Sequence, residues 1–303
     1  MCWCIPGNAS VPLLYSIVIH PGEIRKHTGS HGRFHKHEST QGNRHPHKRI
    51  RIQKRGTFMI GYGEILEGMQ RIGVRSGMEL EVHSSLRSFG PVDGGAETVI
   101  RALKDSVGPN GSLFMPALRL SPDLQKTAED VRLGITYKAR ILSPDEPRSA
   151  MGLIADTFRL QPDVIVGDGV FATAAWGRNA DKAASCGFQH LIDHGGMALM
   201  LGVDIYRLTA MHYVEDLLPQ RVRDIFKPSD AVTVLYPPDA WFVETGTAPV
   251  KAWYTIQDRA FKAGLIRTGH IGDCAVMFFP VADVVGLYAQ ALRRDALGLY
   301  GLA

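Results

Sequence analysis

From Met59 onward, short apolar runs alternate along the chain with longer segments whose apolar residues recur at helical spacing. Strands are expected over residues 79–83, 112–115, 163–166, 173–176, 197–203, 266–271 and 275–279. Helices are expected over residues 62–72, 97–107, 151–159, 209–217, 254–263 and 281–294. The run at 197–203 is apolar throughout, which is typical of a strand buried on both faces. The alternation therefore predicts an α/β protein with helices packed on both faces of a central sheet.

Two segments interrupt this alternation. Residues 118–141 form a long polar stretch, for which we expect a lid or substrate loop. Residues 231–235 and 240–243 have the pattern of two short strands joined by a Pro237-Pro238-Asp239 turn, so a hairpin is expected there. Short joins of this kind predict a mixed sheet, with antiparallel as well as parallel neighbours.

The net charge of +4 conceals two regions of opposite sign. Residues 1–58 hold ten Lys and Arg, two acidic residues and seven of the twelve His, whereas residues 59–303 hold 24 Lys and Arg against 28 acidic residues. The mildly acidic body suits a polycationic substrate. The leader over 1–58 is too polar to bury a core, and we expect it to be disordered. It is either a nucleic-acid or metal-binding arm or, the favoured interpretation, a translated or expression-derived leader with Met59 as the natural start.

Hydrophobic runs and cysteines limit the setting in which the protein works. No run of about 18 apolar residues occurs, so neither a membrane-spanning helix nor a membrane partner is expected. The four Cys do not indicate a disulfide framework, and Cys186 and Cys274 are expected to be buried thiols. A reducing, cytoplasmic location fits this pattern best.

The most informative local pattern runs from Glu81 to Thr98. A strand leads directly into small hydroxyl residues, the Gly94-Gly95 pair follows, and a helix begins beyond it. A corner of this kind leaves backbone N–H groups free to meet an anionic or polar ligand, and the glycine pair permits positive φ and close backbone approach. Neither glycine-rich nucleotide-binding fingerprint is present here. Taken alone, the corner could equally be an ordinary glycine turn with a helix N-cap.

This corner closely resembles the acetyl-CoA-binding segment of the aminoglycoside 3-N-acetyltransferase family. Residues 143–152 look like the family's Ser-x-Met-Gly region, and residues 195–204 are similar to its buried strand. Residues 209–215 look like its Thr-x-x-His-x-x-Glu signature. The blocks follow in the family's order and spacing from about Met59 to about Arg294. The resemblance implies a three-layer α/β/α fold, distinct from the more common N-acetyltransferase fold (GNAT).

The resemblance also implies an activity and its participants. The implied activity is acetylation of the 3-amino group of the 2-deoxystreptamine ring of aminoglycosides, which gives antibiotic resistance. Acetyl-CoA is the implied cosubstrate, and no metal is implied. The residues expected to bind acetyl-CoA are His83, Ser84, Ser85, Leu86, Arg87, Ser88, Gly94, Gly95, Thr98 and Thr173. The acids expected to bind the substrate's ammonium groups are Asp93, Asp204, Glu215 and Asp216. Each acid taken singly could also be a solvated or structural residue.

A general base is needed to take a proton from the substrate ammonium. His212 and Glu215 lie three residues apart, so they share one face of the helix expected there. We expect His212 to take the proton, while Glu215 orients the imidazole or binds substrate ammonium. The alternative is a structural His–Glu pair on a surface helix. A metal site would need further ligands, and none is evident at suitable spacing.

One departure from the family pattern concerns its His-Pro-x-x-Ser motif. This chain has Asp168 at the His position, Gly169 at the Pro position and Ala172 at the Ser position, with Thr173 beside it. Asp168 is either a substitute for the imidazole, as a weak base or ammonium anchor, or an ordinary turn residue in Gly-Asp-Gly. As a base it would need burial to raise its pKa toward 7.

Three alternatives to an aminoglycoside acetyltransferase remain at this point. One is an acyltransferase of the same fold acting on another amine. Another is a CoA- or drug-binding protein with weak or no turnover, because of the replacement at Asp168. The last is a nucleic-acid-binding protein using the basic arm, although nucleic acid is not the expected partner. Only this last alternative predicts that deleting residues 1–58 abolishes function. The protein is expected to be a monomer or a homodimer.

Overall fold

The computed structural model describes residues 59–303, so the basic, His-rich leader expected over 1–58 lies outside the described residues. Within the described part of the chain, most strands form one seven-stranded sheet in the order β4-β5-β2-β1-β6-β9-β8. Its centre is parallel and consists of β1 (Glu79–Ser84), β2 (Ser112–Leu118) and β6 (Met197–Leu201). Antiparallel strands extend both sides: β4 (Ile165–Val166), β5 (Phe171–Gly177), β8 (Arg267–Ile271) and β9 (Cys274–Pro280). The mixed sheet expected from the sequence is confirmed.

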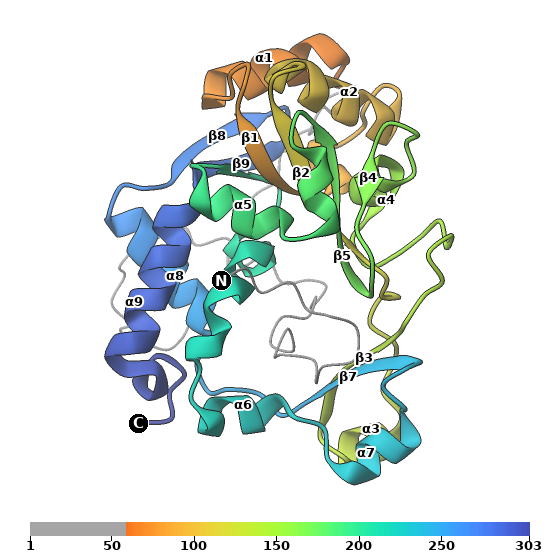
Figure 1. Ribbon diagram of the computed structural model, residues 1–303, viewed down its shortest axis with the longest axis vertical. Helices are drawn as coiled ribbons and strands as arrows, with labels where there is room; N and C mark the ends of the chain where they lie inside the picture. Colours follow the sequence, from red (N-terminus) through yellow and green to blue (C-terminus); the bar gives the residue numbers. More distant parts are fainter. Residues whose placement is uncertain (1–58) are drawn as a thin grey trace, which may run out of the picture.

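Helices cover both faces of this sheet (Figure 1). One face packs against α1 (Tyr62–Ile72), α2 (Gly95–Val107) and α4 (Leu153–Arg159). The other packs against α5 (Gly187–Asp193), α8 (Ala252–Lys262) and α9 (Val281–Leu299). The three-layer α/β/α prediction is therefore confirmed. In the described residues, no helix is both long enough and apolar enough to cross a membrane.

The alternation of side chains along β1 explains how one strand serves both layers. Leu80 and Val82 belong to the hydrophobic core that includes α1, α2 and α4. Glu79, Glu81 and His83 alternate with them and face the opposite layer, where their hydrogen-bond partners lie. A central strand that carries three polar side chains on one buried face needs polar partners there, and this face leads to the candidate site.

Short 3₁₀ helices connect the main elements. They are η1 (Leu86–Phe89), η2 (Ala180–Ala184), η3 (Ile205–Arg207) and η4 (Thr209–Leu217). The helix expected over 209–217 is thus present, but it is wound as a 3₁₀ helix rather than an α-helix. Residues three apart remain on one face in this geometry, so the expected pairing of His212 with Glu215 is preserved.

A second, smaller sheet lies apart from the first at the lower right of Figure 1. It pairs β3 (Ile135–Arg140) with β7 (Trp241–Thr245) in antiparallel fashion. The accompanying helices are α3 (Ala128–Arg132), α6 (Gln220–Phe226) and α7 (Asp230–Leu235). A buried ion pair between Lys138 and Asp130, with the Tyr236 hydroxyl donating to the same carboxylate, ties β3 to α3 and α7.

Residues 118–141, for which a lid or substrate loop was expected, contain α3 and β3, and their role as a lid or substrate loop stays a prediction. The hairpin expected in this region was wrong. Residues 231–235 are not the first strand of a hairpin, because they lie in α7, where Val232 packs against Ile135 and Val243. The partner of β7 comes from about a hundred residues earlier in the chain, and local sequence patterns do not report such distant pairing.

Candidate active site

The carboxyl ends of β1 and β6 meet at one edge of the central sheet, where the expected CoA corner begins. The Ser85 N–H donates to the Leu201 carbonyl (2.9 Å), which continues the β1–β6 pairing into the loop. The Ser88 hydroxyl oxygen lies 2.7 Å from the Ser85 carbonyl oxygen and 3.1 Å from Cys274 Sγ. Gly202 is required beside it, because a Cβ there would lie 1.8 Å from Ser88 Oγ. Ser88 therefore has a structural role in shaping η1.

The glycine pair adopts the backbone conformation expected for it, with φ of 71° at Gly94 and 60° at Gly95. A Cβ at Gly94 would lie 2.4 Å from Thr98 Oγ1, so only glycine fits at that position. Gly94 caps α2 without a side-chain hydrogen bond, which leaves amide donors at the helix start for an anionic group. A groove of about 450 Å³ begins at Gly94 and Thr98 and continues along α2 past Arg101 and Lys104. These donors suit the phosphates of CoA, although Lys104 also pairs with Asp163 (2.8 Å).

His212 and Glu215 form the pair expected from the sequence. His212 Nδ1 lies 2.8 Å from Glu215 Oε2, and the two side chains are only 10% and 2% exposed. The imidazole also packs edge-on against the Trp253 ring, with centroids 5.1 Å apart. Because Glu215 engages Nδ1 and thereby fixes the ring, Nε2 is the nitrogen at which a proton can be exchanged. The arrangement suits a general base with an orienting carboxylate.

The segment that carries this pair is anchored by side chains from β1. Leu208, at the N-terminus of η4, supplies no capping side chain. Instead the Ala210 N–H donates to Glu81 Oε1 (3.1 Å), and the Thr209 N–H lies 3.3 Å from His83 Nε2. Glu81 and His83 also contact each other at 2.8 Å. His83, expected to bind the cofactor, is thus buried beneath η4 in the structure. Sequence reasoning missed Glu81, although a charge inside an apolar strand was the available signal.

The acids expected to bind substrate divide into two groups. Asp204 and Glu215 both act on the Tyr206 hydroxyl, whose pKa is raised to about 12 by burial and by neighbouring acids. Asp204 Oδ1 also accepts the Tyr206 N–H (3.0 Å) and so caps η3. Asp93 and Asp216 are both exposed: Asp93 precedes α2 and Asp216 lies near the end of η4. Two of the four expected acids therefore act on the same tyrosine hydroxyl, and the other two do not.

Glu244 joins this group and was missed from the sequence. It lies in β7, is 6% exposed, and is the acid that raises the pKa of Tyr206 most after burial itself. Burial raises the pKa of the Glu244 carboxyl well above its ordinary value, and the charges of Glu215 and Asp123 raise it further. The signal in the sequence was again a lone charge within an apolar run, here Trp241 to Val243.

The remaining expected residues lie around the β4–β5 turn and η1. Asp168 is exposed in the turn after β4, next to Gly169 with φ of 88°. Thr173 is buried in β5 and its methyl group faces Gly187. Leu86 is half-buried and Arg87 exposed in η1. Among residues 59–303, no three His, Cys, Asp or Glu side chains cluster as a metal site would require.

Comparison with known proteins points in one direction. A family model described as aminoglycoside 3-N-acetyltransferase matches residues 82–293. An aminoglycoside N(3)-acetyltransferase III from Salmonella sp is 35% identical over 169 residues, which cover 50% of this chain and 58% of that relative. An aminoglycoside N(3)-acetyltransferase IV, also from Salmonella sp, is 30% identical over 253 residues, which cover 77% of this chain and 88% of the relative.

Solved structures agree with this assignment at the level of the fold. The apoenzyme of aminoglycoside acetyltransferase AAC(3)-IVa superposes with a TM-score of 0.59 at 21% identity, covering 81% of this chain and 92% of the other. A binary complex of AAC-IIIb with CoASH gives a TM-score of 0.57 at 18% identity, covering 78% and 98%. Because the family model spans more than half of the chain, this protein belongs to the aminoglycoside 3-N-acetyltransferase family.

Proposed function

We propose that this protein transfers the acetyl group of acetyl-CoA to the 3-amino group of the 2-deoxystreptamine ring of an aminoglycoside. It would do so in the cytoplasm, as a monomer or homodimer, and thereby confer antibiotic resistance. Membership of the family supports the proposal. The names of two relatives support it as well, and the matched region covers 58% of one relative and 88% of the other. Among proteins of the same fold, solved structures contain apramycin, a gentamicin, sisomicin and CoASH.

The observation that carries the proposal is the His212–Glu215 pair. The acceptor amine is an ammonium ion in water and must lose a proton before its nitrogen can attack a carbonyl carbon. His212 Nε2 takes that proton, and Glu215 holds the ring through Nδ1 and stabilises the imidazolium that forms. The new C–N bond forms as the C–S bond of the thioester breaks, and CoA leaves as the thiol after protonation.

Acetyl-CoA supplies the activated acetyl group, and the corner between β1 and α2 would hold it. The amide donors at the start of α2 suit its phosphates, and the glycine pair lets the ligand approach the backbone. Asp204, Glu215 and Glu244 all act electrostatically on the Tyr206 hydroxyl, and this group of acids would receive the other ammonium groups of the substrate. Acetylation would remove one of the positive charges with which such a drug binds RNA.

A thiol-release assay on the full chain tests the proposal, with acetyl-CoA and a panel that includes sisomicin, gentamicin and apramycin. We expect CoA release that depends on the aminoglycoside and that His212→Ala reduces by about 10²- to 10⁴-fold, the usual contribution of a general base. Product analysis should place the acetyl group on the 3-amine.

Asp168→Ala is the matched comparison in the same assay. A loss of turnover in this variant, with His212→Ala still active, would mean that the carboxylate has taken over the role of the missing imidazole. A rise in KM with little change in kcat would identify it as an ammonium anchor. Saturable CoA binding without turnover on any aminoglycoside would overturn the proposal and favour another amine or a binding protein.

A further inference from the structure

Trp253, the second residue of α8, connects the His212 imidazole with two buried tyrosines. Its side chain is almost fully buried, with the residue 2% exposed. T-shaped contacts join the indole to the rings of His212, Tyr206 and Tyr288, with centroids 5.1, 6.1 and 6.0 Å apart. These three rings come from η4, η3 and α9. An indole packed against rings from three elements has little freedom to turn, so it is a rigid neighbour for the imidazole.

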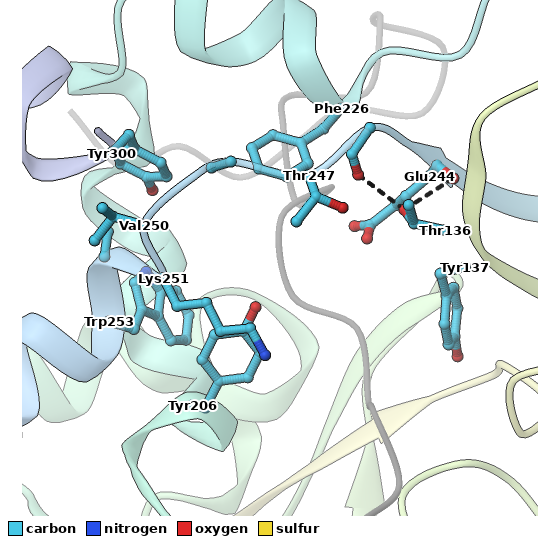
Figure 2. A pocket seen from close by; sticks show the side chains of 13 residues that line it. Thr136, Tyr137, Tyr206, Phe226, Glu244, Thr247, Val250, Lys251, Trp253 and Tyr300 are labelled. Carbon is cyan, nitrogen blue, oxygen red and sulfur yellow. Dashed lines mark hydrogen bonds between the residues drawn. The ribbon is translucent and has the colours of Figure 1, made fainter. Parts of the chain in front are cut away.

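The imidazole is therefore held by two groups from different elements. Glu215 engages Nδ1, and Trp253 packs against the ring. A hydrogen bond at one nitrogen fixes where that atom points but lets the ring tilt about it, and a packed neighbour removes this freedom. The indole also forms part of the wall of a cavity of about 70 Å³, which Tyr206 and Glu244 line as well (Figure 2). His212 is not one of the residues that line it, whereas the indole that contacts His212 is.

The charges around this layer show which groups an imidazolium at His212 would meet. Burial raises the pKa values of Tyr288 and Tyr300, and the charge of Glu215 raises them further, so both hydroxyls stay neutral. Other groups around the layer are Glu81 and His83 from β1, Tyr206 and Arg207 from η3, Glu244 from β7, Lys251 beside α8, and from α5 the non-titrating Phe188, which contacts Tyr213 of η4. Within the described residues, Glu215 is thus the acid bonded to the ring, and the indole is a neutral group packed against it.

We propose that Trp253 is a positioning residue for His212, which fixes the orientation of the imidazole together with Glu215 and stabilises the imidazolium that forms when the ring takes a proton. Indole is the side chain whose π face attracts a cation most strongly, and the effect reaches to about 6 Å from the ring centroid. The contact at 5.1 Å lies within that range. Because the attraction grows as the ring becomes charged, it acts on the barrier more than on substrate binding. The inference rests on the proposed function for the role of His212 as base.

Trp253→Leu tests the proposal, because leucine keeps the position apolar but has no π face. We expect kcat to fall by about threefold to tenfold with KM little changed. The acid limb of the kcat–pH profile should move about 0.5 to 1.5 units lower, because a less stable imidazolium loses its proton at lower pH. Trp241→Leu is the matched control: this half-buried indole contacts Tyr236 and Arg140 in the smaller sheet, and its loss should leave the limb in place. A merely structural role for Trp253 would lower the melting temperature without moving the limb.

NMR titration of the histidine rings in the full chain tests the contact without turnover, with the His212 signal assigned through His212→Ala. The midpoint of this signal should lie lower in Trp253→Leu than in wild type. Trp253→Phe keeps a flat ring with a weaker π face, so it should shift the midpoint the same way by less, and it serves if the leucine variant folds poorly. An unchanged midpoint in both variants, or a higher one in either, would overturn the proposal. A lower midpoint in a protein without acetyl transfer would sustain the role of Trp253 at the ring while the proposed function fails.

Discussion

Glu215 and Glu244 are both buried glutamates in the same electrostatic neighbourhood, but they differ in their partners. Glu215 is 2% exposed and engages the His212 imidazole through Oε2, whereas Glu244 is 6% exposed and forms no ion pair with the described residues. Oε1 of both carboxylates has no hydrogen-bond partner among the described residues. A paired carboxylate can orient a catalytic base, while an unpaired one is suited to receive a cation from outside. The difference separates the group that organises the chemistry from the group that we propose holds the substrate.

The largest effect should come from the paired site. His212→Ala removes the group that takes the proton, and we expect kcat to fall by about 10²- to 10⁴-fold. Sisomicin binding measured by calorimetry should change little, because the ring's main partners are Glu215 and Trp253 rather than the ligand's other amines. If kcat stays within about twofold of wild type, the general base lies elsewhere, and Glu215 does not orient a catalytic base.

Glu215→Gln sharpens the same comparison. The amide keeps the size of the side chain and can still contact Nδ1, but it no longer stabilises the imidazolium that forms during proton transfer. We expect kcat to fall by about tenfold or more, equal to about 1.4 kcal/mol in the barrier, while the melting temperature changes little. A loss of binding with kcat preserved would instead give Glu215 the role assigned to Glu244. The measurement is the separate determination of kcat and KM with a single aminoglycoside.

The position of Glu215 could be predicted from the sequence, whereas that of Glu244 could not. His212 and Glu215 are three residues apart in one local segment, so their pairing follows from helical spacing and from the family signature. The strands of the central sheet were predicted because short apolar runs alternate with segments of helical spacing. Glu244 reaches the cavity only because β7 pairs with β3, about a hundred residues earlier. Pairing over that distance depends on tertiary packing, which propensity does not encode.

Glu81 shows a similar limit within a strand that was predicted correctly. The sequence placed Glu81 in β1 but gave no reason to connect it with η4, which follows more than a hundred residues later. His83 was assigned to the cofactor because it lies in the segment that resembles the family's acetyl-CoA-binding segment, and the structure places it under Thr209. Strand alternation predicts which face a side chain occupies, but the element that covers that face must be found in the fold.

The contact between Glu81 and η4 predicts an effect on stability. Glu81→Ala would leave the buried Ala210 N–H without its acceptor, which costs about 1–3 kcal/mol. Glu81→Gln keeps an acceptor oxygen and should recover most of that loss. Urea denaturation of the three proteins measures the difference. Because η4 carries His212, the alanine variant should also lower kcat, and stability equal to wild type would show that the η4 anchor lies elsewhere.

The smallest effect concerns the unpaired glutamate and appears only as a dependence on pH. The Glu244 pKa is raised in the folded protein, chiefly by burial and then by Glu215 and Asp123, so the folded state holds this proton more tightly than the unfolded state. The stability that the protonated carboxyl contributes is fully present below its unfolded pKa and is lost as pH rises through the folded pKa. Glutamine cannot ionise, so the melting temperature of Glu244→Gln should rise relative to that of wild type as pH increases from about 5 to 8. Each kcal/mol of difference in the free energy of unfolding corresponds to about 2–4 °C. Asp239→Asn, exposed and solvated, should show a constant difference over the same range. If the melting-temperature difference between Glu244→Gln and wild type is also constant, or shrinks as pH rises, the Glu244 carboxylate already has a partner. Glu244 would then resemble Glu215 in being paired.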